Sequence, residues 1–225
     1  MPTPELGTVT QYNGSADVHS FSHTGEDGYG LLVVHYCDGN SSASTVSYAG
    51  QSLSLIKNEV CAWRTANVQI HYLTINGNQG TGTVEINVAG TTARNVIAFA
   101  VNTLYVGSCT SPVTVDDNVS RTDHDLPAMD GTSNDRLLGL FAASTAQNAT
   151  SLQGSWAAPN GTLLATRNYN AGVDTFRALG LIEETSTTGQ VITGQFGQSR
   201  PATGLGIKLT GVTQAAFKRQ FFPVN

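Results

Sequence analysis

Residues 46–56 read V-S-Y-A-G-Q-S-L-S-L-I and combine two features that decide the fold, alternating apolar side chains and a central turn. Val46 and Tyr48 would lie on one face of a strand, and Leu53 and Leu55 on one face of the next strand. Gly50 stands where a three-residue hairpin loop commonly needs a left-handed residue. The stretch therefore predicts a β-hairpin that contributes to a sandwich core.

The same two-residue period continues on both sides of this hairpin. Strand-length runs occur at 31–37, 68–74, 84–88, 95–104, 136–142, 162–166, 176–183, 189–196 and 205–209. Turn-forming clusters separate these runs at intervals of roughly 8–12 residues, a spacing typical of sandwiches and barrels. We expect residues 1–211 to form a single all-β domain, an antiparallel β-sandwich of jelly-roll type with two sheets and little helix.

Composition and charge exclude several classes of protein. The chain of 225 residues carries a net charge of −5 and only 11 scattered Lys and Arg, which argues against a nucleic-acid surface. No run approaches the 18 apolar residues of a membrane span. The first residues, M-P-T-P-E-L-G-T-V-T, lack the basic and apolar regions of a signal peptide. We expect a protein without a signal peptide that binds neither nucleic acid nor membrane.

The sequence lacks the arrangements of reactive residues that enzymes use. It contains no G-x-S-x-G, H-E-x-x-H or Walker motif. Glu183 and Glu184 are adjacent, so on a strand they would point to opposite faces and make a poor glycosidase pair. We expect no catalytic residues, no cofactor and no enzymatic activity. The histidines (His19, His23, His35, His71, His124) are expected to be ordinary packed or surface side chains, and Cys37, Cys61 and Cys109 buried or half-buried thiols in strands.

One acidic segment could suit a calcium ion. Asp116-Asp117-Asn118 and Asp123-His124-Asp125 are expected to lie in a loop, and their oxygen atoms are ligands that Ca²⁺ prefers. The spacing of an EF-hand is absent, and Asp and Asn also occupy loops because they bond to their own backbone. A solvated loop is the favoured interpretation of residues 116–125, and no metal ligand is assigned.

Aromatic residues near turn-rich segments could stack on sugars, although such residues more often cover sandwich cores. They are Trp63, Trp156, Tyr12, Tyr29 and Tyr169. Glycan binding is therefore kept as an alternative, without assigned residues.

Several of these runs, taken in chain order, resemble a known family. They are L-L-V-V-H-Y at 31–36, the hairpin at 46–56, N-V-Q-I-H-Y-L at 67–73, N-G-N-Q-G at 76–80, T-V-E-I-N-V at 83–88, N-V-I-A-F-A-V at 95–101, N-D-R-L-L-G-L-F-A-A at 134–143 and G-L-G-I-K-L at 204–209. They are similar to the concanavalin-like jelly-roll domains of phage virion proteins and bacterial surface proteins. The resemblance covers about residues 28–210, and it implies a fold but no shared catalytic residues.

The resemblance and the acidic balance together predict a non-enzymatic phage virion structural protein, specifically a capsid decoration (cement) protein. It would be made in the host cytoplasm and would bind the major capsid protein or other virion subunits on the outside of the head. We expect a homo-oligomer, with a trimer favoured, because cyclic symmetry fits a shell. The alternative is a receptor- or glycan-binding module of a tail fibre or surface adhesin.

The last residues, 212–225, differ in composition from the rest of the chain. We expect them to form an interaction arm whose aromatic side chains enter an apolar pocket of a neighbour while the basic pair meets an acidic shell surface. In the competing interpretation, two phenylalanines fold back over the edge of their own sandwich. The candidate interface residues of the arm are Phe217, Lys218, Arg219, Phe221 and Phe222.

Overall fold

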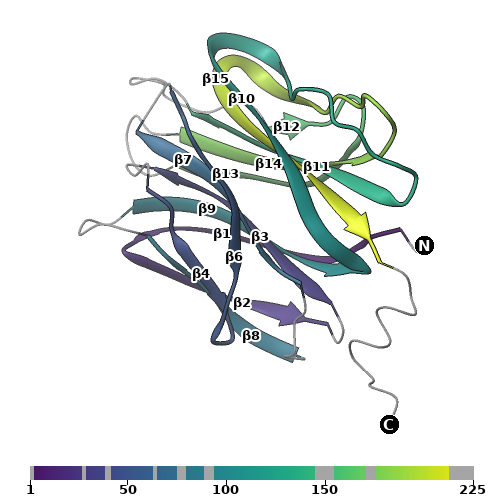
Figure 1. Ribbon diagram of the computed structural model, residues 1–225. Helices are drawn as coiled ribbons and strands as arrows, with labels where there is room; N and C mark the ends of the chain where they lie inside the picture. The colour runs from purple at the N-terminus through teal and green to yellow at the C-terminus, as the bar shows by residue number, and fades with distance from the viewer. Residues whose placement is uncertain are drawn as a thin grey trace.

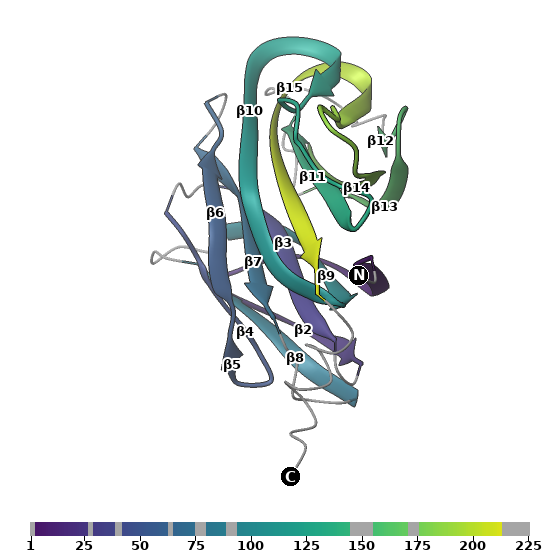
Figure 2. The ribbon, with the colours of Figure 1, turned by 45° about the vertical axis from the view of Figure 1, so that its right-hand side comes forward.

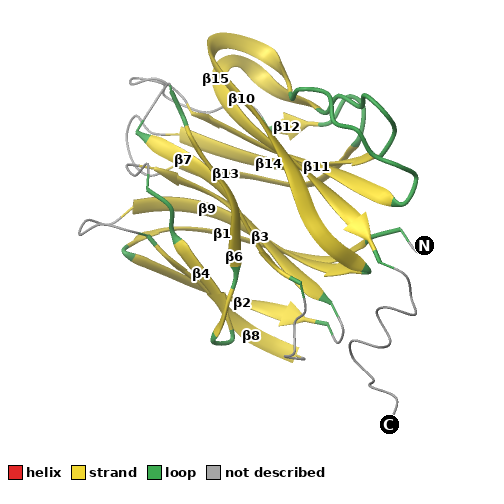
Figure 3. Ribbon diagram, viewed as in Figure 1, coloured by secondary structure: helices red, strands yellow, loops and turns green. Residues whose placement is uncertain are grey.

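The computed structural model describes residues 3–26, 29–38, 42–62, 65–74, 80–88, 94–144, 155–170 and 176–212. Within these ranges the chain forms strands, and no helix occurs (Figure 3). The predicted all-β, antiparallel β-sandwich is confirmed, but the strands form three sheets in place of the two expected. No described helix is long and apolar enough to cross a membrane.

The three sheets are stacked as layers, with sheet A between sheet B and sheet C (Figure 1). Sheet A has the order β1 (Glu5–Ala16), β9 (Arg94–Leu104), β3 (Gly30–Asp38), β7 (Ala66–Leu73) and β6 (Ser54–Val60). Sheet B has the order β2 (Val18–Gly25), β8 (Gly80–Asn87), β4 (Thr45–Tyr48) and β5 (Gln51–Ser52). The strands of residues 5–104 are thus divided between sheets A and B.

Sheet C is built from the rest of the described chain. Its order is β10 (Val106–Asp125), β15 (Thr193–Gly211), β11 (Asp135–Ser144), β14 (Phe176–Thr185) and β13 (Thr162–Asn170), and β12 (Trp156–Ala157) pairs with β15. Figure 2 shows β10 and β15 curving together over one end of this sheet. Every strand pair in the three sheets is antiparallel.

The central position of sheet A explains the continuous apolar run at residues 31–37. All nine residues of β3 are buried. Leu32, Val34 and Tyr36 pack toward sheet C, whereas Leu31 and Val33 pack toward sheet B. A strand covered on both faces has no polar face, so its sequence shows an unbroken run in place of an alternation.

A third core lies on the outer face of sheet C, where none of the described sheets covers it. Trp156 is at its centre, with ring centroids 5.0 Å from Phe196 and 5.5 Å from Phe141. A Cβ atom at Gly180 would lie 2.5 Å from Trp156, so the indole rests directly on the backbone of β14. The segment around Met129 covers this core, and its backbone pairs with Gln190.

The predicted hairpin is confirmed, but its loop has two residues in place of three. Tyr48 pairs with Gln51, which leaves Ala49 and Gly50 as the loop. Both have positive φ angles, 47° and 82° respectively. Positive φ at both central residues is the requirement of a type I′ turn, the turn that matches the twist of a hairpin.

The second strand of the hairpin changes sheets, which the sequence did not predict. β5 ends at Ser52 in sheet B, and β6 begins at Ser54 in sheet A. Leu53 at the crossing is 7% exposed, but Leu55 is 44% exposed, so the expectation that both face the core is wrong for Leu55. Leu53 lies between the two strands where the chain changes sheets, so the alternation that would place Leu53 and Leu55 on one face is interrupted.

Candidate functional site

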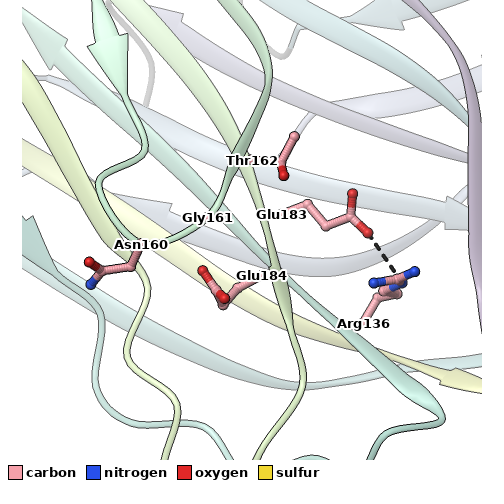
Figure 4. A pocket seen from close by; sticks show the side chains of 6 residues that line it. All are labelled: Arg136, Asn160, Gly161, Thr162, Glu183 and Glu184. Carbon is pink, nitrogen blue, oxygen red and sulfur yellow. Dashed lines mark ion pairs between the residues drawn. The ribbon is translucent and has the colours of Figure 1, made fainter.

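A polar pocket of about 390 Å³ opens at one end of sheet C, where β11 and β13 begin and β14 ends. We call it the end pocket. It is lined by Arg136, Asn160, Gly161, Thr162, Glu183 and Glu184 (Figure 4). Only 12% of the chain is charged, yet three charged side chains gather here, so the pocket differs in chemistry from most of the molecule.

Strand register brings the charged residues of the end pocket together. Glu183 lies on β14 opposite Thr162 of β13 on one side and Leu138 of β11 on the other. Arg136 on β11 lies with its Nε atom 3.2 Å from Glu183 Oε1, and the same nitrogen donates a hydrogen bond of 3.3 Å to the carbonyl oxygen of Pro4. Both contacts use Nε, so the terminal nitrogens of the guanidinium group are not engaged by either one.

The two adjacent glutamates point in different directions, as the sequence predicts. Figure 4 shows Glu183 directed toward Arg136 and Glu184 directed toward Asn160. Both carboxylates are half-buried, and both line the pocket because it sits at the end of the strand rather than on one face of the sheet.

Gly161 determines how closely the pocket wall approaches β14. A Cβ atom at this position would lie 2.4 Å from the backbone oxygen of Glu183 and 2.6 Å from Glu184 Oε2. Real Cβ atoms do not come this near to other atoms, so the segment can run here only with glycine. The absence of a side chain at residue 161 keeps the space between Asn160 and Glu184 open.

From the sequence alone, Glu183 and Glu184 are candidates only as catalytic residues, and nothing singles out Arg136, Asn160, Gly161 or Thr162 as site residues. A partial signal was available, because N-G-T at 160–162 places turn chemistry directly before a strand. What the sequence could not indicate is that this turn would lie beside the end of β14.

The acidic segment 116–125 is not a loop, so that part of the expectation is wrong, but it is solvated as expected, because all of its residues except Asp117 and His124 are exposed. It forms the second half of β10 and pairs with β15 through several register shifts. Asp116 accepts hydrogen bonds from Thr203 Oγ1 and from the backbone nitrogen of Ala62, each 2.8 Å long. Further bonds join Asp123 to Gln195, Asp125 to Thr193, and Asp117 to Arg121 and His124.

These carboxylates therefore stabilise the β10–β15 pairing and its neighbourhood rather than converging on a common point. Within the described ranges, no group of three or more His, Cys, Asp or Glu is arranged to hold a metal ion. The physical reason for the wrong expectation is that irregular strands with bulges accept Asp and Asn as readily as loops do, provided that the partner strand supplies donors.

All five histidines are packed in the interior and are at most 1% exposed. His23 is bonded on both ring nitrogens, to Thr10 Oγ1 at 2.8 Å and to Asn102 Oδ1 at 2.9 Å. His19 lies 3.3 Å from the hydroxyl of Tyr12, so the two histidines of β2 serve different partners. This agrees with the expectation of packed side chains.

The pKa values of His35 and His71 lie below the ordinary value. Burial lowers the pKa of His71 to about 4. Burial, with His71 and His19 nearby, holds the pKa of His35 well below its usual range. Both imidazoles are therefore neutral near pH 7.

The thiols and the described aromatic residues also have packing roles. Cys37 and Cys61 are buried and Cys109 is half-buried, and burial raises the pKa of each thiol to about 12. Trp156 lies in the third core, and the ring of Tyr12 stacks on that of Phe21 with their centroids 4.8 Å apart. Tyr29 and Tyr169 are half-buried, and Tyr169 packs against the core between sheets A and C. Trp63 and the arm residues Phe217, Lys218, Arg219, Phe221 and Phe222 fall outside the described residues.

No protein-family model matches the chain, and no curated protein matches it in sequence.

Proposed function

We propose that the protein is a non-enzymatic structural protein of a phage virion, a capsid decoration protein that binds the outside of the head as a homo-oligomer, with a trimer favoured. The virion assignment rests on the resemblance of the strand and turn sequences to concanavalin-like phage domains. The structural observation that carries the binding role is the chemistry of the outer face of sheet B.

The outer face of sheet B is a hydroxyl-rich surface with a single charge among its described residues. Buried His19, His23, Val84, Ile86, Val46 and Tyr48 mark the inner face, so the residues between them point outward. The outward set is Val18, Ser20, Ser22, Thr24, Thr45, Ser47, Ser52, Thr81, Thr83, Glu85 and Asn87. Short hydroxyl side chains can make many modest hydrogen bonds across a broad contact with a protein shell.

The placement of the reactive groups supports a role without chemistry. Catalytic histidines need a pKa near the working pH and access to a substrate, and catalytic thiols need a lowered pKa. In this protein the histidines are buried, and each cysteine has a pKa of about 12. Burial therefore keeps these groups in the forms that are least useful to an enzyme.

The decisive experiment is to locate and count the protein in purified virions by cryo-electron microscopy and quantitative mass spectrometry. A decoration protein is expected in hundreds of copies on the head, in symmetric clusters. A few copies at the tail tip would favour the receptor-binding alternative instead. Absence from the particles would contradict both virion roles.

A surface variant tests which face makes the contact. Thr83→Arg places a long charged side chain at the centre of the outer face of sheet B and should weaken capsid co-sedimentation at least about tenfold, the effect of losing roughly 1.4 kcal/mol of binding free energy. Thr122→Arg on the exposed part of β10 is the matched control and should bind normally. Equal binding by the two variants would exclude the outer face of sheet B as the contact.

The end pocket favours a second candidate function, a receptor- or glycan-binding module. A concave site with converging polar groups is the usual form of a small-ligand site. A reproducible, specific signal for the intact protein on a glycan array would favour this candidate over capsid decoration.

A further inference from the structure

We infer that the end pocket binds a neutral saccharide, whose hydroxyl groups bond to Arg136, Asn160, Thr162 and the two glutamates. This inference deepens the second candidate function and does not depend on capsid binding.

The side chains of the end pocket supply both donors and acceptors. Glu183 and Glu184 offer acceptor oxygens, and the terminal nitrogens of Arg136 are donors only. Asn160 supplies an amide, and its Nδ2 makes one long bond of 3.4 Å to Thr193 Oγ1. A sugar hydroxyl is at once a donor and an acceptor, so a ring with neighbouring hydroxyls can satisfy both kinds of group together.

The charge and the ligand set of the end pocket argue against anions and metal ions. Two carboxylates and one guanidinium line it, which repels an anion. A metal ion would need more ligands, and the described part of the chain contains no group of three or more suited to one. The contact between Arg136 and Glu183 already neutralises one carboxylate, and the amide of Asn160 and the hydroxyl of Thr162 are uncharged, so the lining suits a ligand bound by hydrogen bonds.

The size and shape of the end pocket limit the ligand to about one or two sugar rings. Its volume of about 390 Å³ is at the lower end of that of typical ligand sites. Gly161 lets the backbone of the wall approach Glu184 closely without filling the space between them, because any side chain at residue 161 would collide with β14. The lining contains no aromatic residue on which a ring could stack, so we expect weak binding, with Kd of about 1–10 mM for one site. Copies repeated on a particle would strengthen it by avidity.

The test is an NMR titration of the intact ¹⁵N-labelled protein with glucose, galactose, mannose and N-acetylglucosamine. At least one sugar should shift the backbone amide signals of residues 160–162 and 183–185 in a saturable way. Asn160→Ala and Glu184→Gln should each weaken the fitted affinity about tenfold, the effect expected when a hydrogen bond to a ligand is lost. Glu85→Gln, on the outer face of sheet B, is the control and should leave the affinity unchanged.

Two results would overturn the inference. One is that none of the four sugars shifts these signals at about 50 mM, well above the expected Kd. The other is that the shifts persist unchanged in both pocket variants, which would place binding elsewhere. Unchanged signals from residues 31–37 show that each variant is folded. Because the end pocket is in sheet C and Thr83 is in sheet B, failure of sugar binding and failure of capsid binding are separate outcomes.

Discussion

The two faces of sheet A are packed in opposite ways. Toward sheet C, aliphatic and aromatic side chains from the five strands of sheet A pack with those of sheet C in one large cluster. The ion pair between Asp38 and Arg177 lies at the margin of this cluster. Toward sheet B, a smaller apolar cluster adjoins a group of buried polar side chains. These are His19, His23, His35, Asn67, Gln69, His71 and Asn102.

The polar side chains of β7 hold the segment that leads into sheet B. Gln69 Oε1 accepts hydrogen bonds from the backbone nitrogen of Ser44 at 2.9 Å and from His71 Nε2 at 3.1 Å. Asn67 Nδ2 donates to the carbonyl oxygen of Ser42 at 2.8 Å. His35 stacks on His71, with ring centroids 5.4 Å apart. Neither ring nitrogen of His35 has a hydrogen-bond partner among the described residues.

Sheet A is therefore held to sheet C mainly by apolar packing, and to sheet B by apolar packing together with hydrogen bonds between buried polar side chains. Apolar packing is indifferent to pH, whereas a buried imidazole must stay neutral. We therefore expect the contact between sheets A and B to fail before the contact between sheets A and C.

The largest expected effect is acid destabilisation of the contact between sheets A and B. The pKa of His71 is about 4 in the folded protein against an ordinary 6.5, so the unfolded chain binds the proton first. The contribution of neutral His71 to the unfolding free energy is fully present above pH 6.5, decreases as the pH falls, and is lost below about pH 4. His71 alone accounts for a loss of about 3 kcal/mol, and His35 adds to it.

Denaturant unfolding at pH 7.5 and pH 4.5 measures this loss, and His71→Gln should reduce it. His124→Gln, in sheet C, is the control and should reduce it less. Hydrogen exchange at pH 4.5 should show β4 and β8 opening before β11 and β14. Simultaneous opening of both pairs would contradict the comparison.

The ion pair in the other interlayer space should give the next largest effect. Arg177→Met removes the guanidinium group from the Asp38 carboxylate, on a residue only 7% exposed, which costs about 3 kcal/mol of unfolding free energy. Arg121→Met removes a partner of Asp117 at a position where the arginine side chain is 53% exposed, and should cost less than about 1 kcal/mol. Similar losses for both variants, measured by urea denaturation, would show that burial of the pair is unimportant.

A smaller effect is expected at the hairpin of sheet B. Ala49 has a φ of 47°, a conformation that costs a residue with a Cβ atom about 1 kcal/mol relative to glycine. Ala49→Gly should therefore raise the unfolding free energy by about 0.5 kcal/mol once the greater chain entropy of glycine is subtracted. Gly50→Ala, at a φ of 82° with open space around it, should lower it by about 1 kcal/mol. Thermal melts of the pair should move in opposite directions.

The smallest change in stability is expected from deleting the end of the chain. The backbone nitrogen of Val212 still bonds to the carbonyl oxygen of Tyr105 at 2.9 Å, so the deletion should begin at residue 213. If the arm serves an interface, the protein lacking 213–225 should melt at nearly the same temperature but lose oligomerisation and capsid binding, as measured by light scattering and co-sedimentation. Unfolding on deletion would assign the arm to the core.

Local patterns in the sequence predict much of the fold. The hairpin at residues 46–56, the buried strand at 31–37 and the opposite directions of Glu183 and Glu184 all follow from side-chain alternation. The run of four aliphatic residues at 31–34 in β3 implies cover on both faces, but which strands supply that cover depends on pairing between residues far apart in the sequence. Two layers were therefore predicted where three exist.

The candidate site escaped prediction for the same reason. Residues 160–162 and 183–184 become neighbours only through the register between β13 and β14. Asp116, Asp123 and Asp125 of β10 likewise accept hydrogen bonds from β15, 68 to 87 residues away, so the donors cannot be recognised from the neighbouring sequence.

The place of β9 in sheet A has a consequence for synthesis on the ribosome. β9, the last of the five strands to be made, lies between β1 and β3. The first hundred residues must therefore leave the exit tunnel before sheet A can close. At about 5–20 residues per second, the apolar β3 stays uncovered for several seconds. During this interval the nascent chain is most exposed to chaperones and to aggregation, and a translational pause just after residue 104 would prolong it.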